Sequence, residues 1–280
     1  MKKTKLAKAV SIIATGAAFS LGMASTASAH VMYNTGIFAS TDGWTGAMDG
    51  NIIPWVGTAG GVRPFSYIGY QALNWAAEID ASGSVQEVSQ ADSISNYGFA
   101  ADIDTANGAW GSWQVDPADP TFTRGWAHST DYGLIKSLVD TEVQIKVSKV
   151  NQADDLNNFG ITVFTGMDDN TGEGFGHHSP WNIGYVSGVF EAPAQVDNPL
   201  GTGGLTYLTH GDQSVVSFQA EAGQVYSIYL GGNDIGGDIL GDNFAYKAEI
   251  SAVPVPAAVW LFGSALLGML GVSRKRTLSV

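Results

Sequence analysis

The sequence predicts an all-β fold: an antiparallel β-sandwich or jelly-roll-like single domain, flanked by a signal peptide and a C-terminal hydrophobic sorting helix. Three observations support this prediction. Gly accounts for 36 of the 280 residues and aromatic residues for 11%, which is typical of many short strands joined by turns. Several segments alternate apolar and polar residues with the period of two of a half-buried strand. No segment keeps a helical period over three turns.

Five segments carry the strand pattern. Apolar residues at 143, 145 and 147 alternate with polar ones, and 159–164 follows after a polar loop. Residues 216–220 and 226–230 alternate on either side of a Glu-Ala-Gly turn, so together they predict a hairpin. Residues 244–250 present one more apolar face. These segments supply the strands of the predicted sandwich.

Two further segments are ambiguous between strand and short helix, namely residues 72–79 and 135–139. The chain shows neither an internal repeat nor a Pro- or Ser-rich linker between its two ends. We therefore expect one domain, spanning residues 30–252.

The predicted domain is strongly acidic. Residues 30–253 contain six basic and 26 acidic side chains, a formal charge of −20. Because binding to phosphates depends on clustered Lys and Arg, this balance excludes nucleic acid and anionic lipid as partners of the domain. The chain has no Cys, which excludes disulfides, thiolate metal sites and a cysteine nucleophile.

The first 29 residues have the features of a secretory signal peptide. Four Lys precede position 9, an apolar stretch follows, and Ala27-Ser28-Ala29 fits the small-residue cleavage motif. Cleavage after Ala29 would make His30 the first residue of the mature protein.

The C-terminal end, residues 253–276, combines three features in order. Pro254 and Pro256 precede an apolar run of 16 residues, 257–272, and Arg274, Lys275 and Arg276 follow it. The run is marginal in length for a membrane-spanning helix. The basic cluster is of the kind that holds such a helix at the cytoplasmic face.

This order of Pro-x-Pro, apolar run and basic cluster resembles the PEP-CTERM sorting signal of Gram-negative bacteria. The residue between the prolines is Val255, where the name of the signal has Glu. The resemblance implies an exosortase as partner, a transient anchor in the inner membrane, and release or attachment of the domain at the cell surface or in the extracellular matrix.

All five His lie in the predicted domain, and His128 has the most informative neighbours. In an extended chain Trp126 and His128 share one face, and Asp131 is close enough to orient an imidazole. The same pattern also fits a buried sheet edge.

Together with residues 159–166 and Gly176-His177-His178, this motif resembles the copper-binding, copper-repressible surface proteins of methane-oxidising bacteria. The resemblance implies that Trp126 and His128 form the local copper motif, that Trp126 is oxidised, and that His178 or His177 is the second Cu(I) ligand. The thioether of Met167 is a possible third contact.

His30 supports a different metal prediction. A free N-terminal amine, its own imidazole and a second His form the copper brace of lytic polysaccharide monooxygenases, which this junction resembles. No other His has a convincing spacing for that role.

Acidic loops suggest a hard cation instead. Asp168, Asn170 and Glu173 alternate as in a calcium turn, without the bidentate Glu of an EF-hand. Residues 231–242 contain one imperfect copy of a calcium-binding nonapeptide, and a single copy cannot form a β-roll. Solvated turns explain both segments equally well.

Aromatic residues among Gly and Asp are typical of an exposed surface that stacks on sugars. The Trp residues in this context are Trp44, Trp55, Trp110, Trp113 and Trp181. Core packing is the alternative explanation. The sequence contains no Gly-x-Ser-x-Gly motif and no phosphate loop, so nothing in it favours a hydrolase or a nucleotide enzyme.

The sequence thus predicts a non-enzymatic, surface-sorted protein that captures or displays copper outside the cell. The alternative is a matrix protein that binds exopolysaccharide or calcium, and the third reading is a copper oxygenase that begins at His30.

Overall fold

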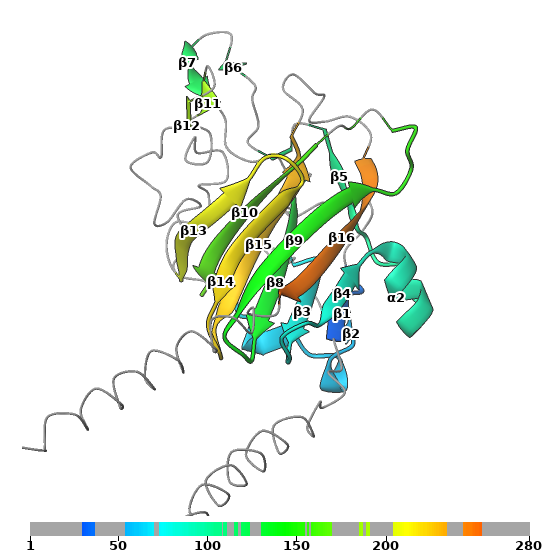
Figure 1. The fold of residues 1–280 in the computed structure, drawn as a ribbon. Helices are drawn as coiled ribbons and strands as arrows, with labels where there is room; N and C mark the ends of the chain where they lie inside the picture. Colours follow the sequence, from blue (N-terminus) through cyan, green and yellow to red (C-terminus); the bar gives the residue numbers. More distant parts are fainter. Residues whose placement is uncertain are drawn as a thin grey trace, which may run out of the picture.

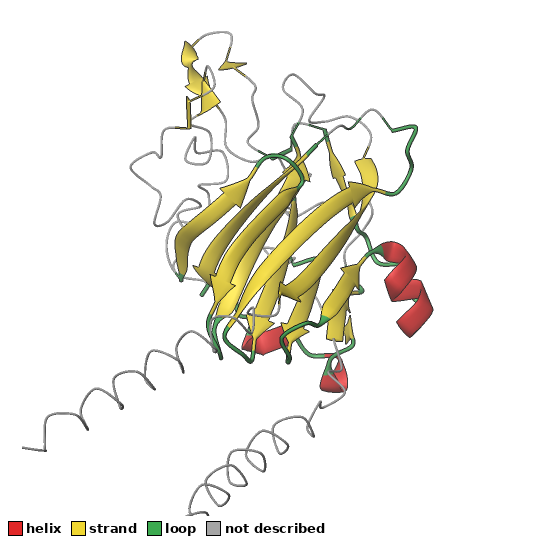
Figure 2. Ribbon diagram, viewed as in Figure 1, coloured by secondary structure: helices red, strands yellow, loops and turns green. Residues whose placement is uncertain are grey.

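The computed structural model describes most of the chain between His30 and Val253 (Figure 1). The described residues are 30–36, 54–69, 73–107, 109–110, 115–116, 119–123, 130–154, 156, 158–169, 185–186, 189–190, 204–233 and 243–253. They form two β-sheets with a buried core between them (Figure 2). The all-β, sandwich-like single domain predicted from the sequence is confirmed.

The larger sheet has seven strands. Their order is β13 (Leu205–Gly211), β10 (Phe159–Gly166), β15 (Val225–Gly232), β8 (Asp131–Ser137), β3 (Trp75–Ile79), β1 (His30–Asn34) and β2 (Trp55–Val56). All its pairings are antiparallel except that of β3 with β8, which is parallel.

The smaller sheet has five strands, all antiparallel. Its order is β14 (Val215–Ala220), β9 (Thr141–Lys149), β16 (Asn243–Val253) and β4 (Val85–Val88), with β5 (Asp104–Ala106) paired to β16. Two short pairs lie apart from both sheets: β6 (Val115–Asp116) with β7 (Asp119–Thr123), and β11 (Tyr185–Val186) with β12 (Val189–Phe190). Figure 1 shows both pairs beyond one end of the sandwich.

The core between the sheets follows from the alternation in the sequence. Val143, Ile145 and Val147 of β9 are buried, whereas Gln144 and Lys146 between them are exposed. The facing strands of the larger sheet contribute their own alternate residues to the same core. Each buried Val or Ile side chain contributes about 1.5–3 kcal/mol, so this core is the main source of stability.

The prediction of a hairpin over residues 216–230 is wrong. β14 pairs with β9 in the smaller sheet, while β15 pairs with β10 and β8 in the larger one. The connection therefore crosses from one sheet to the other, and the rings of Phe218 and Tyr226 meet across the core at 4.9 Å between centroids. Alternating apolar residues fit this arrangement as well as a hairpin, because in both cases one face of each strand is buried.

The two ambiguous segments are resolved as strands, since residues 75–79 form β3 and residues 135–137 belong to β8. The structure adds one α-helix, α2 (Gln90–Tyr97), and two short 3₁₀ turns, η2 (Ala59–Gly61) and η3 (Pro64–Ser66). The Ser89 hydroxyl caps α2 by accepting from the amide of Asp92, and Gly98 ends the helix at φ 68°. At eight residues, α2 makes little more than two turns, too few to show a helical period over three turns.

The larger sheet also buries its other face. A second apolar cluster, here called the outer cluster, covers this face. Its buried members are Met32, Trp55, Tyr67, Leu73, Ala76, Trp110, Tyr132, Leu134, Phe164, Leu205 and Tyr229. Both faces of the larger sheet are therefore covered, and His210 and Trp110, discussed below, lie on the outer face.

The expectation that Trp55 and Trp110 are exposed for sugar stacking is wrong, since each is only 3% exposed. Trp55 is a buried residue of the edge strand β2. The ring of Trp110 lies against Gly160, where the missing side chain leaves room for an indole. Trp44, Trp113 and Trp181 lie outside the described residues.

Within the part of the chain that the structure describes, no helix has the length and apolar character needed to cross a membrane. The predicted signal peptide, residues 1–29, and the sorting residues Pro254, Pro256, Arg274, Lys275 and Arg276 lie outside the described residues.

Candidate metal centre

Most of the predicted site residues lie outside the part of the chain that the structure describes. These are Trp126, His128, Asn170, Glu173, His177 and His178. The structure describes His30, Met167 and Asp168, together with both ends of the strand that follows the Trp126–His128 motif. The positions of these residues and of His210 show which candidate metal ligands can lie near one another.

The strand β8 begins directly after the Trp126–His128 motif, and its start is firmly held. Thr130, two residues after His128, donates its hydroxyl proton to the carbonyl of Ala109 at 3.1 Å. Asp131 is fully buried on the inner face and accepts a hydrogen bond from the hydroxyl of Tyr246 at 2.7 Å. The same hydroxyl accepts from Trp75 Nε1 at 3.1 Å. The orientation of His128 by Asp131 stays a prediction. One carboxylate oxygen of Asp131 is already bound to Tyr246 inside the core.

His210 lies on the outer face of β13, opposite Thr162 of β10. Its Nδ1 is 2.5 Å from the hydroxyl oxygen of Tyr207. Residues three apart normally face opposite sides of a strand, but the register of β13 shifts opposite Val163 and Phe164, so both side chains fall on the same face. The β-bulge thus creates a Tyr–His pair that alternation alone does not predict.

Trp110 completes this group. Its ring centroid lies 6.1 Å from that of His210, at an interplanar angle of 31°. Its Nε1 donates to the hydroxyl of Thr162 at 2.9 Å, and its backbone amide donates to the carbonyl of Gly232 at 3.0 Å. An indole fixed by two hydrogen bonds therefore lies beside the imidazole of His210.

The surroundings of His210 favour a neutral imidazole. Burial lowers the pKa of His210 below its ordinary value of 6.5, while the charge of Asp212 acts in the opposite direction. A neutral imidazole is the form that binds a metal, and a hydrogen bond at one ring nitrogen fixes the orientation of the other. With Nδ1 engaged by Tyr207, Nε2 is the nitrogen suited to a metal.

The fold places His210 and the start of β8 at the same end of the larger sheet. His210 pairs with Thr162, Thr162 with Tyr229, and Tyr229 with Tyr132. Three strand spacings, about 14 Å, therefore separate His210 from this part of β8. Ala109 and Trp110 fill the space between them, because Ala109 contacts Thr130 and Trp110 contacts His210.

Met167 lies at the other end of the sheet. Ile161 and Asp131 both pair with Leu230, and Gly166 is five residues further along β10, about 17 Å away. The side chain of Met167 packs against the outer cluster. A contact between Met167 and copper at His128 stays a prediction, and this placement does not favour it.

His30 begins β1, and its Nε2 contacts the carbonyl oxygen of Gly57. Five strand spacings separate β1 from β13, about 24 Å, so His210 is too far away to complete a copper brace with His30. Within the described residues, no group of three or more His, Asp or Glu side chains is arranged to hold a metal.

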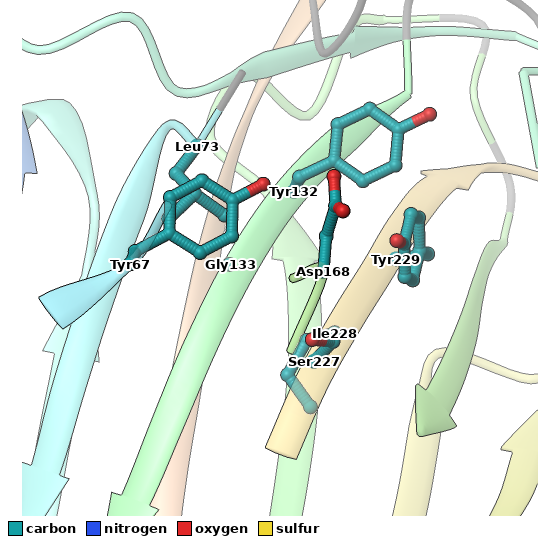
Figure 3. Close-up of a pocket in the computed structure, with 8 residues that line it drawn as sticks. All are labelled: Tyr67, Leu73, Tyr132, Gly133, Asp168, Ser227, Ile228 and Tyr229. Carbon is teal, nitrogen blue, oxygen red and sulfur yellow. The ribbon is translucent and has the colours of Figure 1, made fainter. Parts of the chain in front are cut away.

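The sequence predicts either a calcium turn that contains Asp168, Asn170 and Glu173 or a solvated turn in the same place. The structure instead places the side chain of Asp168 in the outer cluster region, 2% exposed, among three Tyr residues (Figure 3). Calcium binding by this segment therefore stays a prediction without support from the position of Asp168.

Comparison with known proteins found neither a matching protein family nor a curated relative. Two similar solved structures are both copper-binding proteins. CorA, a surface-associated protein important in copper acquisition by Methylomicrobium album BG8, is 10% identical with a TM-score of 0.32, over 63% of this chain and 98% of CorA. MopE, a secreted protein of Methylococcus capsulatus in which an oxidised Trp facilitates copper binding, is 11% identical with a TM-score of 0.31, over 79% of this chain and 93% of MopE. The function proposed below rests on the residues of this chain.

Proposed function

We propose that this protein binds copper outside the cell, as Cu(I), with His128 and His210 as the two imidazole ligands. Its role is to capture or display the metal, not to catalyse a reaction. The observation that carries the proposal is the arrangement of His210, Trp110 and Thr130 along one end of the larger sheet.

The distances are compatible with a shared site. His128 precedes Thr130 by two residues, which span at most about 7 Å of extended chain. Tyr132 and His210 are about 14 Å apart across the sheet, and Thr130, two residues further along, is about 16 Å from His210. Two residues of chain and two imidazole side chains can close this distance. The predicted partners His177 and His178 remain the alternative to His210, and the experiment below separates them.

The chemistry of the group also fits Cu(I). Imidazole nitrogen is a good ligand for copper, and Cu(I) accepts two such ligands. The lowered pKa of His210 keeps its imidazole neutral near pH 7, so a proton does not compete with the metal. Two indoles, Trp110 and Trp126, would lie near the metal, and Trp126 stays the residue predicted to be oxidised.

We further propose that an exosortase processes the chain near Pro254 and Pro256 and delivers the domain to the cell surface. The support is the order of residues in the C-terminal tail. β16 runs to Val253, so the last strand of the smaller sheet ends directly before Pro254. Intact mass of protein taken from the cell surface tests this: a C-terminus beyond Arg276 on every molecule would contradict it.

The matrix-protein alternative is weaker in the described part of the chain, because Trp55 and Trp110 are buried and Asp168 is not on an exposed turn. The oxygenase reading depends on His30, whose ring nitrogen already contacts the carbonyl of Gly57. The matrix-protein and oxygenase readings predict other results than the copper proposal for the same set of His variants.

A Cu(I) titration against a chromophoric competitor tests the proposal on the exported full chain and five single variants. His128→Ala and His210→Ala should each weaken binding at least tenfold. The matched control is His30→Ala, a His at the far side of the same sheet, which should bind like the parent. Loss of binding in a His177→Ala or His178→Ala variant, with His210→Ala unaffected, would identify the alternative second ligand. Loss in His30→Ala alone would support the oxygenase.

A further inference from the structure

The strand β14 lies at the edge of the smaller sheet and, among the described strands, pairs with β9 alone (Figure 1). The amide of Val147 in β9 donates to the carbonyl of Ser214 at 2.8 Å, which fixes the alternation of this antiparallel ladder. The even-numbered residues of β14 therefore exchange hydrogen bonds with β9, whereas Ser217 and Gln219 direct their N–H and C=O groups away from the sheet. No described strand pairs with this side of β14.

The open part of the edge is short and has defined ends. At its start, Gly211 of β13 lies so close to the carbonyl oxygen of Val215 that a methyl group on Gly211 would collide with it. Beyond its end, the amide of Glu221 donates to the hydroxyl of Tyr226 at 2.8 Å. A further strand can therefore pair with residues 216–220, and the centre of this segment is Phe218.

The edge of β14 lacks the features that keep other strands from pairing with an exposed edge, such as small length, a bulge, a charge or Pro. Its sequence, Val-Val-Ser-Phe-Gln-Ala, has no charged residue and no Pro, and its register with β9 is regular over all six residues. The other described edges are protected. β2 has two residues, β5 has three, β13 shifts register, and β4 carries Glu87 in an ion pair with Lys247 at 3.5 Å.

The charges around β14 favour a second copy of this chain as the partner, in antiparallel orientation. Lys146 lies beside the start of β14, opposite Val215, and Glu142 lies beside its end, opposite Gln219. Glu221, which directly follows the strand, adds a second acidic side chain at that end. A two-fold axis reverses the direction of the strand, so the basic end of each copy meets the acidic end of the other.

We propose that β14 is a self-association surface, at which two copies of this chain pair antiparallel through residues 216–220 and join their smaller sheets into one. Ser217 of each copy pairs with Gln219 of the other, and each such pair exchanges two backbone hydrogen bonds. The Ser217 hydroxyl accepts from Gln144 at 3.3 Å, so its own proton is left for the Gln219 side chain of the second copy. The inference is independent of the copper proposal, because no proposed copper ligand lies on β14.

Sedimentation velocity of the exported full chain, freed of metal by a chelator, measures the association. Two short strands form a contact smaller than a standard interface, so we expect a dissociation constant on the order of 100 μM. Ser217→Pro removes the amide proton that the second copy would accept, and Pro is tolerated on an edge strand where the N–H faces outward. It should raise the dissociation constant at least tenfold. A parent protein that stays monomeric up to about 1 mM, ten times the expected constant, would overturn the proposal.

Two Ser→Lys substitutions provide a matched pair that does not depend on the folding of Ser217→Pro. Ser217→Lys places like charges close to the axis and should weaken association at least tenfold. Ser251→Lys adds the same charge on the same face of the sheet, but between β4 and β9, and should associate like the parent. Association that is equal in the parent and in both Ser217 variants would overturn the proposal, because the contact would then lie elsewhere, for example in the C-terminal tail that all variants share.

Hydrogen exchange of the segment 215–220 identifies what covers the edge. The amides of Ser217 and Gln219 should become protected as the protein concentration rises through the dissociation constant. Protection of these amides in the monomer, independent of concentration, would show that another part of the chain covers the edge, and this would also overturn the proposal. Cu(I) titration of the Ser217 variants should match the parent, so failure of this proposal and failure of the copper proposal are separate results.

Discussion

Tyr246 of β16 in the smaller sheet forms hydrogen bonds with two residues of the larger sheet, Trp75 of β3 and Asp131 of β8. Its hydroxyl donates to Asp131 and accepts from Trp75, and all three side chains are fully buried. We predict that Tyr246→Phe, which removes only this hydroxyl, lowers the free energy of unfolding by about 3–4 kcal/mol.

The magnitude follows from the two hydrogen bonds. The bond to Asp131 involves a carboxylate, and such bonds contribute about 1.5–3 kcal/mol. The indole N–H of Trp75 would lose the acceptor that now lies at 3.1 Å and would remain buried, which costs about 1–3 kcal/mol. The Phe ring keeps its contact with Phe159, now 6.0 Å between centroids, so no cavity is created. Burial and the nearby charge of Asp131 also raise the pKa of Tyr246 well above 10, so the neutral phenol is the form removed.

Thermal unfolding followed by circular dichroism measures the effect. For a domain of this size, about 3–4 kcal/mol corresponds to a fall in Tm of roughly 6–15 °C. Tyr226→Phe is the matched control, because the Tyr226 hydroxyl accepts one hydrogen bond, from the amide of Glu221 at 2.8 Å. It should cost about 1 kcal/mol. If Tyr246→Phe lowered the stability no more than Tyr226→Phe does, the two hydrogen bonds of Tyr246 would not anchor β8 and this reasoning would be refuted.

Three further predictions concern the outer face and the pH dependence. Gly160→Ala should lower the free energy of unfolding by about 1–3 kcal/mol and weaken Cu(I) binding, because the new methyl group would meet the ring of Trp110; parent-like urea unfolding and copper affinity would contradict this. Stability should fall as the pH rises above 10, because the raised pKa values of Tyr132 and Tyr229 keep these groups protonated in the folded state while the unfolded chain loses the protons; urea midpoints that stay constant from pH 9 to 11 would argue against it. Because the pKa of His210 is lowered from 6.5, protonation of His210 should weaken Cu(I) binding only at a pH below 6.5; a His210-dependent loss of affinity between pH 8 and 7, measured by titrating the parent and His210→Ala, would contradict this.

The strands were predictable from the sequence because each buries one face. The alternation at 143–147 fixed both the strand β9 and the identity of its buried residues. Alternation does not indicate which strand is the hydrogen-bonding neighbour. For this reason the pattern predicts a hairpin of β14 with β15, whereas each of them pairs with other strands. The helix α2 had visible signals in Ser89 and Gly98, but its eight residues are too few for a periodic pattern.

The candidate site was less predictable for a structural reason. His210 and Tyr207 meet because β13 shifts register against β10, and no residue type in the sequence marks that shift. Trp110 reaches His210 from a segment 100 residues earlier in the chain. The burial of Asp168 depends likewise on the turn at Gly166 and on Tyr residues from two distant strands. Contacts of this kind depend on the pairing of the whole sheet.

Both faces of the larger sheet bury polar side chains beside apolar ones. On β15 the inward residues Tyr226, Ile228 and Leu230 belong to the main core, while Ser227 and Tyr229 face outward. The same division on β8 places Gly133 and Ile135 inward and Tyr132 outward. Buried polar groups are tolerated where they are hydrogen-bonded. On the inner face Trp75 and Asp131 bond to Tyr246, and on the outer face Trp110 bonds to Thr162 and His210 to Tyr207. The difference that bears on the copper proposal is the imidazole of His210, which lies on the outer face beside the indole of Trp110.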